Sequence, residues 1–325
     1  MISGTAILQK SQANSIVWVS LLYYVLMCFL APGFFSVYNT WNLLYSFFPL
    51  LIAAIGQTFV IITAGIDLSI TSVIALCSVA GGYLMSTDTG LGLASYQSIS
   101  LAFVLMLICG ACIGLINGLS VTRLGMPAFM VTLISMIFFS GLAIWFTQSQ
   151  NIYNLPEPFV NMPYTFVLGL PVPTYIGLAV LLLAYVLLAR TLWGDWIYAV
   201  GLNSKVSRIS GVKVNKTIVA VYVFSGLCAA LASFLYTARL ETGSPVMGQA
   251  LLLDIIGGVV IGGTSLYGGK GKIHWTFFGV LFIVMLDNSL NLIGLSYFLI
   301  MMVKGLVILL AAMLNLANDR LTKPS

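Results

Sequence analysis

Long runs of apolar residues alternate with short polar connections along the chain. Each run is about twenty residues long, the length an α-helix needs to cross the hydrocarbon core of a bilayer. The pattern predicts ten spans, near 15–31, 41–64, 68–87, 99–122, 127–148, 173–190, 216–238, 251–265, 275–293 and 296–317. The span near 251–265 is short and contains two Gly-Gly pairs, so we expect it to be broken or tilted. The predicted fold class is therefore an all-α polytopic membrane protein with about ten transmembrane helices, some of them broken or short.

The composition supports this interpretation of the apolar runs. Of the 325 residues, 60% are hydrophobic and 6% are charged, and the mean hydropathy is +1.08. Soluble domains carry about 25% charged residues. The longest polar stretch, residues 191–215, is too short to hold a nucleotide-binding domain. We therefore expect residues 1–325 to form a single transmembrane domain.

The positive charges predict how the spans are oriented. With a cytoplasmic N-terminus, ten spans place Arg239 outside, and Lys304 falls within the last span. The other cations all lie on the inside: Lys10, Arg123, Arg190, Lys205, Arg208, Lys213, Lys216, Lys270, Lys272, Arg320 and Lys323. Cytoplasmic loops carry the excess of Lys and Arg, so both termini are predicted to be cytoplasmic. The net charge of +5 then reflects topology and does not indicate binding to nucleic acid.

A polar segment, residues 63–72, interrupts the apolar sequence between the second and third spans. It contains Gly65, Asp67 and Ser69. A charge at membrane depth costs about 2.5–3.5 kcal/mol on insertion scales. The predicted topology places this segment near the cytoplasmic end of both spans, where Asp67 or Ser69 can cap the third helix. We expect a structural helix junction that fixes two spans.

Further polar residues lie inside the predicted spans. They are Asn117, Asp254, Asp287, Asn288 and Asn291, and the last three are expected to share one helix face. Polar groups in a membrane usually face the interior of the helix bundle or a water-filled path. Two interpretations stay open at this point: these side chains line a translocation path, or they hold helices together by hydrogen bonds.

Glycines at regular spacing predict close packing between helices. Gly110, Gly114 and Gly118 recur every four residues in one span, and Gly258 and Gly262 repeat the spacing in another. Small residues at this interval let two helix backbones approach each other.

The sequence carries no pattern that indicates catalysis. The glycine-rich run 262–272 lacks the Gly-Lys-Ser/Thr end of a phosphate-binding loop, and we interpret it as a tight cytoplasmic turn. His274 has no carboxylate nearby in the sequence, and the five cysteines lie in apolar runs, where they act as small hydrophobic residues. We expect no catalytic residue, no metal site and no cofactor, so this chain is not predicted to be an enzyme.

The polar stretch 191–215 predicts a short helix in a cytoplasmic loop. Asn203 or Ser204 can cap its start and Gly211 can end it. Val206 and Ile209 are then one turn apart, with Lys205 and Arg208 beside them. Two or three apolar side chains are too few for strong lipid binding, so we expect a protein partner.

Four motifs, in order along the chain, resemble those of one family. They are Gly-Ile-Asp-Leu-Ser-Ile-Thr-Ser at 65–72, Pro-Ala-Phe-Met-Val-Thr-Leu at 127–133, the segment from Gly-Leu-Asn to Gly-Val at 201–212, and Leu-Asp-Ile-Ile through Val-Ile-Gly-Gly-Thr at 253–264. The sequence resembles, over about residues 40–315, the permease subunits of bacterial ABC importers of the ribose and simple-sugar class. It departs from their pattern at Thr71 and Leu202, where glycine is usual, and by the insertion of Ala128.

The resemblance implies a permease of the bacterial inner membrane that carries a monosaccharide or a similar small polar solute. Its partners would be a cytoplasmic ABC ATPase, a periplasmic sugar-binding protein docked on the outer loops, and a second permease chain, identical or similar. The ATPase would bind the coupling segment, whose residues are Gly201, Asn203, Lys205, Val206, Arg208, Ile209 and Gly211.

Three alternatives accompany this hypothesis. One is a membrane scaffold that transports nothing, but the abundance of polar groups inside the spans argues against it. A secondary transporter driven by an ion gradient would use Asp67, Asp254 and Asp287 as ion carriers. A permease for branched-chain amino acids is a neighbouring possibility within the same superfamily, but the motif at 65–72 favours the sugar branch.

Overall fold

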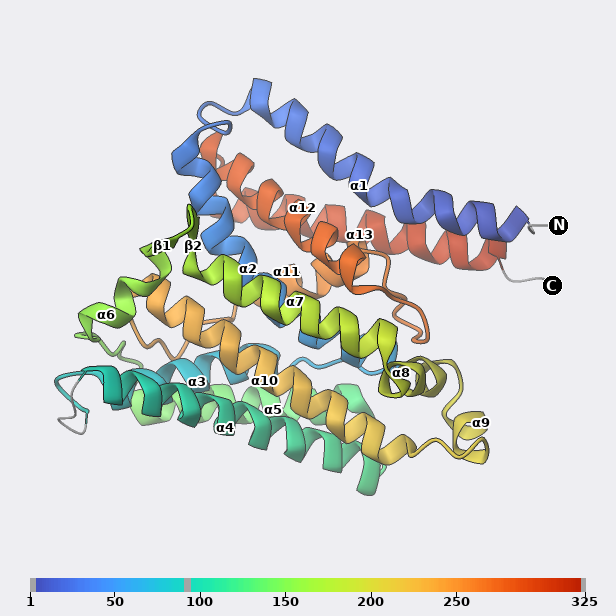
Figure 1. Ribbon diagram of the computed structural model, residues 1–325, viewed down its shortest axis with the longest axis horizontal. Helices are drawn as coiled ribbons and strands as arrows, with labels where there is room; N and C mark the ends of the chain where they lie inside the picture. Colours follow the sequence, from blue (N-terminus) through green and yellow to red (C-terminus); the bar gives the residue numbers. More distant parts are fainter. Residues whose placement is uncertain (1–3, 91–94, 323–325) are drawn as a thin grey trace.

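All ten predicted spans are helices in the computed structural model, which describes residues 4–90 and 95–322 (Figure 1). Their bounds are α1 Gly4–Leu30, α2 Val37–Ile62, α3 Ile70–Met85, α4 Ser95–Arg123, α5 Ala128–Thr147, α7 Val172–Arg190, α10 Val214–Leu240, α11 Leu251–Ile261, α12 Ile273–Leu292 and α13 Tyr297–Thr322. The short span predicted near 251–265 is α11, with 11 residues.

Within the described residues, six helices are long and apolar enough to cross a membrane: α2, α4, α5, α7, α10 and α12. Shorter apolar helices cover Ile16–Leu30, Ile70–Met85, Leu251–Ile261 and Tyr297–Met313. The polytopic helical architecture is thus confirmed. The count of ten crossings and the cytoplasmic position of both termini stay predictions, and Lys323 lies outside the described residues.

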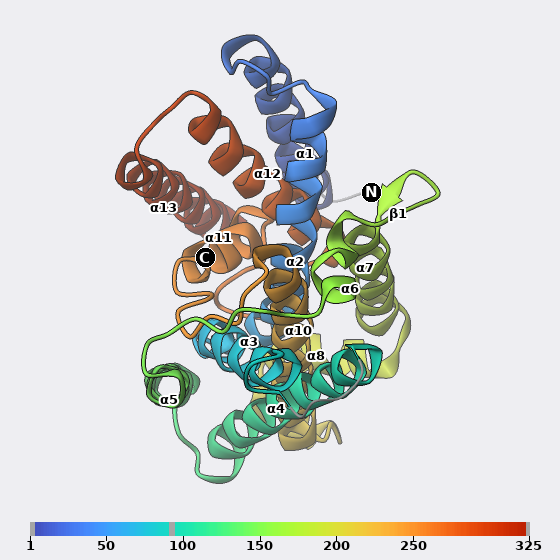
Figure 2. The ribbon, with the colours of Figure 1, turned by 90° about the vertical axis from the view of Figure 1, so that its left-hand side faces the viewer.

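Helix α2 lies at the centre of the bundle (Figure 2). The Ser36 hydroxyl caps its N-terminus by accepting the Asn39 amide, and every residue from Phe47 to Ile62 is buried. Such a helix is apolar around its whole circumference because it has neighbours on all sides. Figure 2 shows α1, α12 and α13 on one side of it, α3, α4 and α5 on the other, and α7 at the flank.

The predicted glycine face on α4 is confirmed. A methyl group on Gly110 would overlap the carbonyl oxygen of Gly226 in α10, and one on Gly114 would overlap the carbonyl oxygen of Tyr222. The second glycine pair also packs closely: a methyl group on Gly258 would lie 2.8 Å from the Val280 side chain of α12. These crossings therefore bring helix backbones into direct contact.

Two connections contain structure that the apolar pattern did not reveal. The crossing 149–172 holds α6 Glu157–Val160, a 3-10 turn Met162–Tyr164, and a two-stranded hairpin of β1 Phe166–Val167 and β2 Leu170–Pro171. The stretch 191–215 is not simply a polar loop with one short helix. It forms two helices, α8 Leu192–Leu202 and α9 Ser204–Ile209. Helix α8 buries Ile197 and Val200.

Candidate functional site

The junction between α2 and α3 is built around a buried carboxylate. Asp67 is 2% exposed. Its Oδ1 accepts the Ser69 amide at 3.0 Å and the Ser69 hydroxyl at 2.6 Å, and its Oδ2 accepts the Ser225 hydroxyl of α10 at 2.8 Å. Of the two predicted cap residues, Asp67 binds the backbone at the start of α3, while Ser69 makes no capping bond with its side chain. Three donors offset the cost of burying this carboxylate.

The hydrogen bonds of Asp67 continue into two more helices. The Asn117 amide of α4 donates to the Ser69 hydroxyl at 2.8 Å and accepts the Ser135 hydroxyl of α5. We call Asp67, Ser69, Asn117, Ser135 and Ser225 the junction network. Asn117, for which a role in the path and a role in joining helices both stayed open, is fully buried and lies in this network, apart from the other four candidate path residues. Ser135 and Ser225 were missed because one serine in an apolar run carries no local signal.

Gly65 permits a close approach at the same junction. A methyl group there would lie 2.9 Å from the Tyr222 hydroxyl of α10 and 3.2 Å from Val60. Thr71, where the resemblance in sequence predicts a glycine, is also buried. Its carbonyl oxygen would lie 2.8 Å from a methyl group on Gly248, so Gly248 provides the glycine for this backbone contact.

Helix α9 presents unpaired apolar side chains. Asn203 caps it as predicted, and its Oδ1 accepts the amides of Lys205 at 3.0 Å and Val206 at 3.1 Å. Gly211 follows the helix with a φ of +86°, a left-handed conformation that glycine adopts without strain. Val206 is 56% exposed and Ile209 is 88% exposed. This small apolar surface, with Lys205 and the other basic side chain, Arg208, exposed beside it, is suited to a protein partner.

Gly201 does not belong to this exposed surface, which corrects its place in the predicted coupling segment. It is buried within α8, where a methyl group would overlap the carbonyl oxygen of Ile62 at the end of α2. The same Ile62 oxygen accepts the Gly269 amide at 2.8 Å, and the Tyr198 hydroxyl of α8 donates to the Gly271 carbonyl at 2.7 Å. Helix α8 therefore contacts both the end of α2 and the 262–272 turn.

A charged cluster joins three other helices. Lys304 of α13 lies 2.9 Å from Asp254 of α11 and 2.9 Å from Asp287 of α12. The side chains of Lys304 and Asp254 are mostly buried, at 12% and 11% exposed, whereas Asp287 is 44% exposed. Asn291 donates to the carbonyl oxygen of Asp287 at 2.7 Å and is exposed. We call these four residues the charged cluster. Lys304 could have been predicted as the partner of these carboxylates, since it is a lone cation in an apolar run.

Asn288 points elsewhere, so the predicted common face of Asp287, Asn288 and Asn291 is wrong for this residue. Its amide exchanges two hydrogen bonds with Asn39 of α2, at 2.9 and 2.8 Å. Neighbouring positions on an α-helix point about 100° apart, so residues 287 and 288 face different helices.

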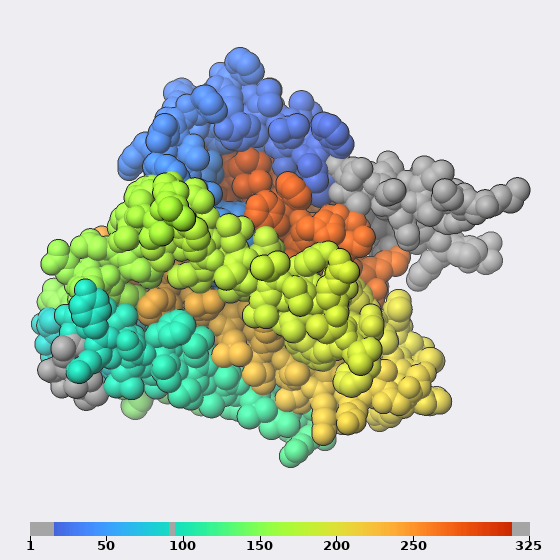
Figure 3. Space-filling view, in the orientation of Figure 1, coloured from blue at the N-terminus to red at the C-terminus, as the bar shows by residue number. Residues whose placement is uncertain are grey.

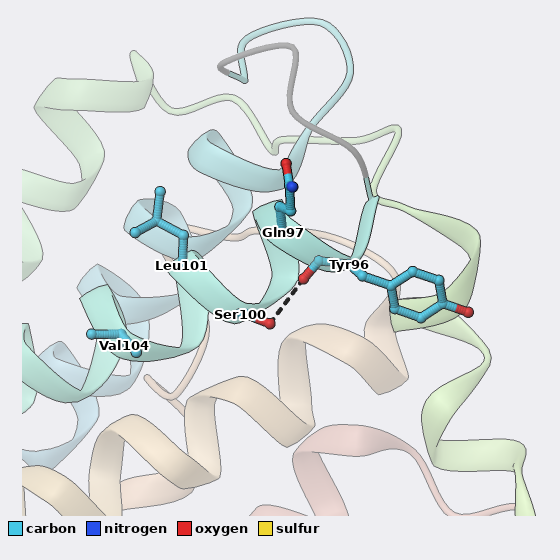
Figure 4. Close-up of a pocket in the computed structure, with 5 residues that line it drawn as sticks. All are labelled: Tyr96, Gln97, Ser100, Leu101 and Val104. Atoms are coloured by element: carbon cyan, nitrogen blue, oxygen red, sulfur yellow. Dashed lines mark hydrogen bonds between the residues drawn. The ribbon is translucent and has the colours of Figure 1, made fainter.

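The remaining candidate sites offer little support for a binding function. A shallow hollow lies along one side of α4, lined by Tyr96, Gln97, Ser100, Leu101 and Val104 (Figure 4). All five residues come from a single helix, and the Ser100 hydroxyl is bonded to the Tyr96 carbonyl at 2.9 Å. Within the described residues, no group of three His, Cys, Asp or Glu side chains is placed to hold a metal ion.

The known proteins that are similar to this chain are permeases, the class of protein that its four motifs resemble. Residues 39–312 match the family described as "Branched-chain amino acid transport system / permease component". The ribose import permease protein RbsC of Haemophilus influenzae is 38% identical over 87% of this chain and 86% of its own length. RbsC of Bacillus subtilis is 39% identical over 90% and 88%, and the D-allose transport system permease protein AlsC of Escherichia coli is 34% identical over 79% and 77%.

No solved structure matches the chain. The family match covers most of the residues that form the helical bundle, including the junction network, α9 and the charged cluster. The chain therefore belongs to the family of transport-system permease components.

Proposed function

We propose that this chain is the permease subunit of an ABC importer and that it forms the translocation path for a monosaccharide. It is a multi-pass protein of the bacterial inner membrane. The sugar class is supported by the names of the relatives, which are permease proteins for ribose import, D-allose transport and fructose import. The observation that carries the mechanism is the exposed apolar surface of α9, on a helix rigidly capped at its start.

Energy enters through a separate ATPase. The glycine-rich turn 262–272 lacks the spacing of a phosphate-binding loop, so ATP is hydrolysed by a cytoplasmic partner. That partner holds Val206 and Ile209 of α9. When ATP binding closes the ATPase subunits, α9 moves with them.

The movement of α9 reaches the bundle through α8. The contacts of Gly201 with Ile62 and of Tyr198 with Gly271 connect α8 to the end of α2 and to the turn before α12. The end of α2 continues directly into the junction network, which joins α3, α4, α5 and α10. A displacement of α8 therefore acts on both halves of the bundle.

The charged cluster is our candidate for the path. Asp287 and Asn291 are substantially exposed although they belong to a helix apolar enough to span the membrane. Acyl chains cannot solvate such groups, so these side chains face a water-filled path, which we place beside a second permease chain. Asp254 and Lys304 complete the polar wall, while Asn288 and Asn117 hold helices together. A periplasmic sugar-binding protein delivers the substrate to the outer crossings.

A substitution on α9 tests this function. Ile209→Asp places a charge in the apolar contact with the ATPase. We expect the variant to insert and fold normally, to lose co-purification with the cognate ATPase, and to lose ATP-dependent sugar uptake in proteoliposomes. Ile209→Leu keeps the apolar surface and serves as the matched control.

The same assay separates the importer from an ion-driven carrier. Uptake that continues without ATP, stops when the ion gradient is collapsed, and is unchanged by Ile209→Asp would refute the proposal. The structure gives the ion-driven alternative no free carboxylate among the three it requires. Asp67 is bonded to serines, and Asp254 and Asp287 are paired with Lys304.

A further inference from the structure

The hairpin of β1 and β2 has an apolar tip whose side chains are exposed. Phe166 pairs with Pro171 and Val167 with Leu170, and Leu168-Gly169 makes the turn. Phe166 and Val167 are each 47% exposed, and Leu168 is 94% exposed. Among the large apolar side chains that the structure describes, Leu168 is the most exposed.

The turn itself is unusual for a surface in contact with water. Leu168 and Gly169 have φ angles of +48° and +81°. A two-residue turn with both φ angles positive favours Asn, Asp or Gly at its first position, because a bulky side chain is strained there. A leucine at this position is unfavourable in water for two reasons: its backbone is strained, and its apolar side chain is exposed. In an apolar environment the exposure of the side chain no longer costs free energy.

The hairpin also lacks any charged side chain that could form an ion pair with a protein partner. No Asp, Glu, Lys or Arg occurs between Glu157 and Arg190. The Trp41 ring packs edge-on against Phe166 with centroids 5.0 Å apart, and Tyr38 is 77% exposed. Aromatic residues gather at the boundary between acyl chains and headgroups.

The direction of the hairpin distinguishes lipid from a partner seated on top of the bundle. In the view along the helices, the β1 strand and its turn project sideways from the bundle, beyond α7 (Figure 2). Figure 3 shows the green lobe of this crossing beside the blue N-terminal helices, at the surface of the molecule. The backbone of the hairpin is largely satisfied: the strands pair with each other, the Val172 amide donates to the Thr165 carbonyl at 3.1 Å, and the Tyr175 hydroxyl donates to the Val167 carbonyl.

We propose that this hairpin is a membrane anchor whose tip, Phe166 to Leu170, inserts into the headgroup–acyl boundary of the leaflet on its side of the membrane. Its pairing supplies the internal hydrogen bonds that non-helical backbone needs near hydrocarbon. The crossing 149–172 then has two parts. The segment around Asn154, hydrogen-bonded to Asp88 at 2.7 Å, faces water, and the hairpin faces lipid.

Site-directed spin labelling tests the anchor. The five free cysteines are replaced by alanine, and one cysteine is introduced by Leu168→Cys or, as the matched control in the same crossing, by Asn154→Cys. Each full-length protein is labelled and reconstituted in vesicles of phosphatidylethanolamine and phosphatidylglycerol. Electron paramagnetic resonance then compares the accessibility of each label to oxygen, which concentrates in lipid, and to a water-soluble nickel chelate.

We expect the label at 168 to be several-fold more accessible to oxygen than to the nickel chelate, and the label at 154 to show the reverse. Equal access of the chelate to both labels would mean that the tip lies in water and would overturn the proposal. A label at 168 that is immobilised and shielded from both reagents would mean that protein covers the tip, which would also overturn it. Sugar uptake is not measured, so the outcome is independent of the proposed transport function.

Discussion

Asp67 is the residue whose role is most sharply defined by its contacts. In Asp67→Asn the remaining oxygen can still accept the Ser69 amide, and the new amide group can donate to the Ser225 hydroxyl, which rotates to accept. We expect this variant to keep most of its stability and transport. Asp67→Ala leaves buried donors unpaired at about 1–3 kcal/mol each. Thermal unfolding in detergent and uptake in proteoliposomes measure both effects. A folded Asp67→Asn protein without any transport would show that the charge itself is required.

Lys304 stabilises two carboxylates, so its loss should cost more than that of a surface lysine. Removing one partner of a buried ion pair costs about 3–5 kcal/mol. We expect Lys304→Met to lose about 3 kcal/mol, because Asp287 is 44% exposed and water solvates it in part. The measurement is again the thermal midpoint in detergent, with exposed Lys216→Met as the control.

The double variant Lys304→Met with Asp254→Asn checks the reason for that loss. It leaves a single carboxylate, on the half-exposed Asp287, and should recover part of the stability. No recovery would mean that Lys304 acts through its packing and not through its charge.

The hydrogen-bond partners of individual side chains were the part of the site that could not be predicted from the sequence. Asp67 and Ser69 were predicted from a local motif, and the capping of α9 by Asn203 from a local pattern. Asn288 and Asn39 are 249 positions apart, and Asp67 and Ser225 are 158 apart. Which asparagine meets which is decided by the rotation of each helix about its axis, and apolar runs do not specify that rotation.

At the scale of helices, the crossing of α4 and α10 depends on glycine. Gly114→Ala would push a methyl group into the Tyr222 carbonyl, and overpacking of this kind costs about 1–3 kcal/mol. The matched control is Gly141→Ala in α5, where a methyl group meets nothing within 4 Å. We expect a lower thermal midpoint for the first variant and an unchanged one for the second. Equal midpoints would show that the two helices separate easily.

The helices themselves were the most predictable feature. A run of about twenty apolar residues has few alternatives to a helix in a membrane, because each backbone group must find its partner within the segment. Helix α8 escaped prediction since its 11 residues are too few to span and are interrupted by Asp195. The hairpin escaped because two residues per strand leave no alternation to detect.

For the molecule as a whole, the contact of α8 with the 262–272 turn should decide how tightly ATP hydrolysis is coupled to transport. Tyr198→Phe removes the hydrogen bond to the Gly271 carbonyl and keeps the ring. We expect the complex with the ATPase to assemble normally and to consume more ATP per sugar transported. Tyr185→Phe, at an exposed position of α7, is the control. An unchanged ratio in both variants would exclude this contact from the transmission of movement.

The central position of α2 has a consequence for how the protein is made. Helix α2 ends at residue 62, but α7, α10 and α12, which surround it, begin at residues 172, 214 and 273. A ribosome therefore delivers α2 to the membrane well before its neighbours exist. Thr58, fully buried in the finished bundle, lacks during that interval the Thr276 hydroxyl of α12, to which its own hydroxyl is hydrogen-bonded at 2.9 Å. The core of this molecule is thus among the first parts to be synthesised and the last to reach its final surroundings.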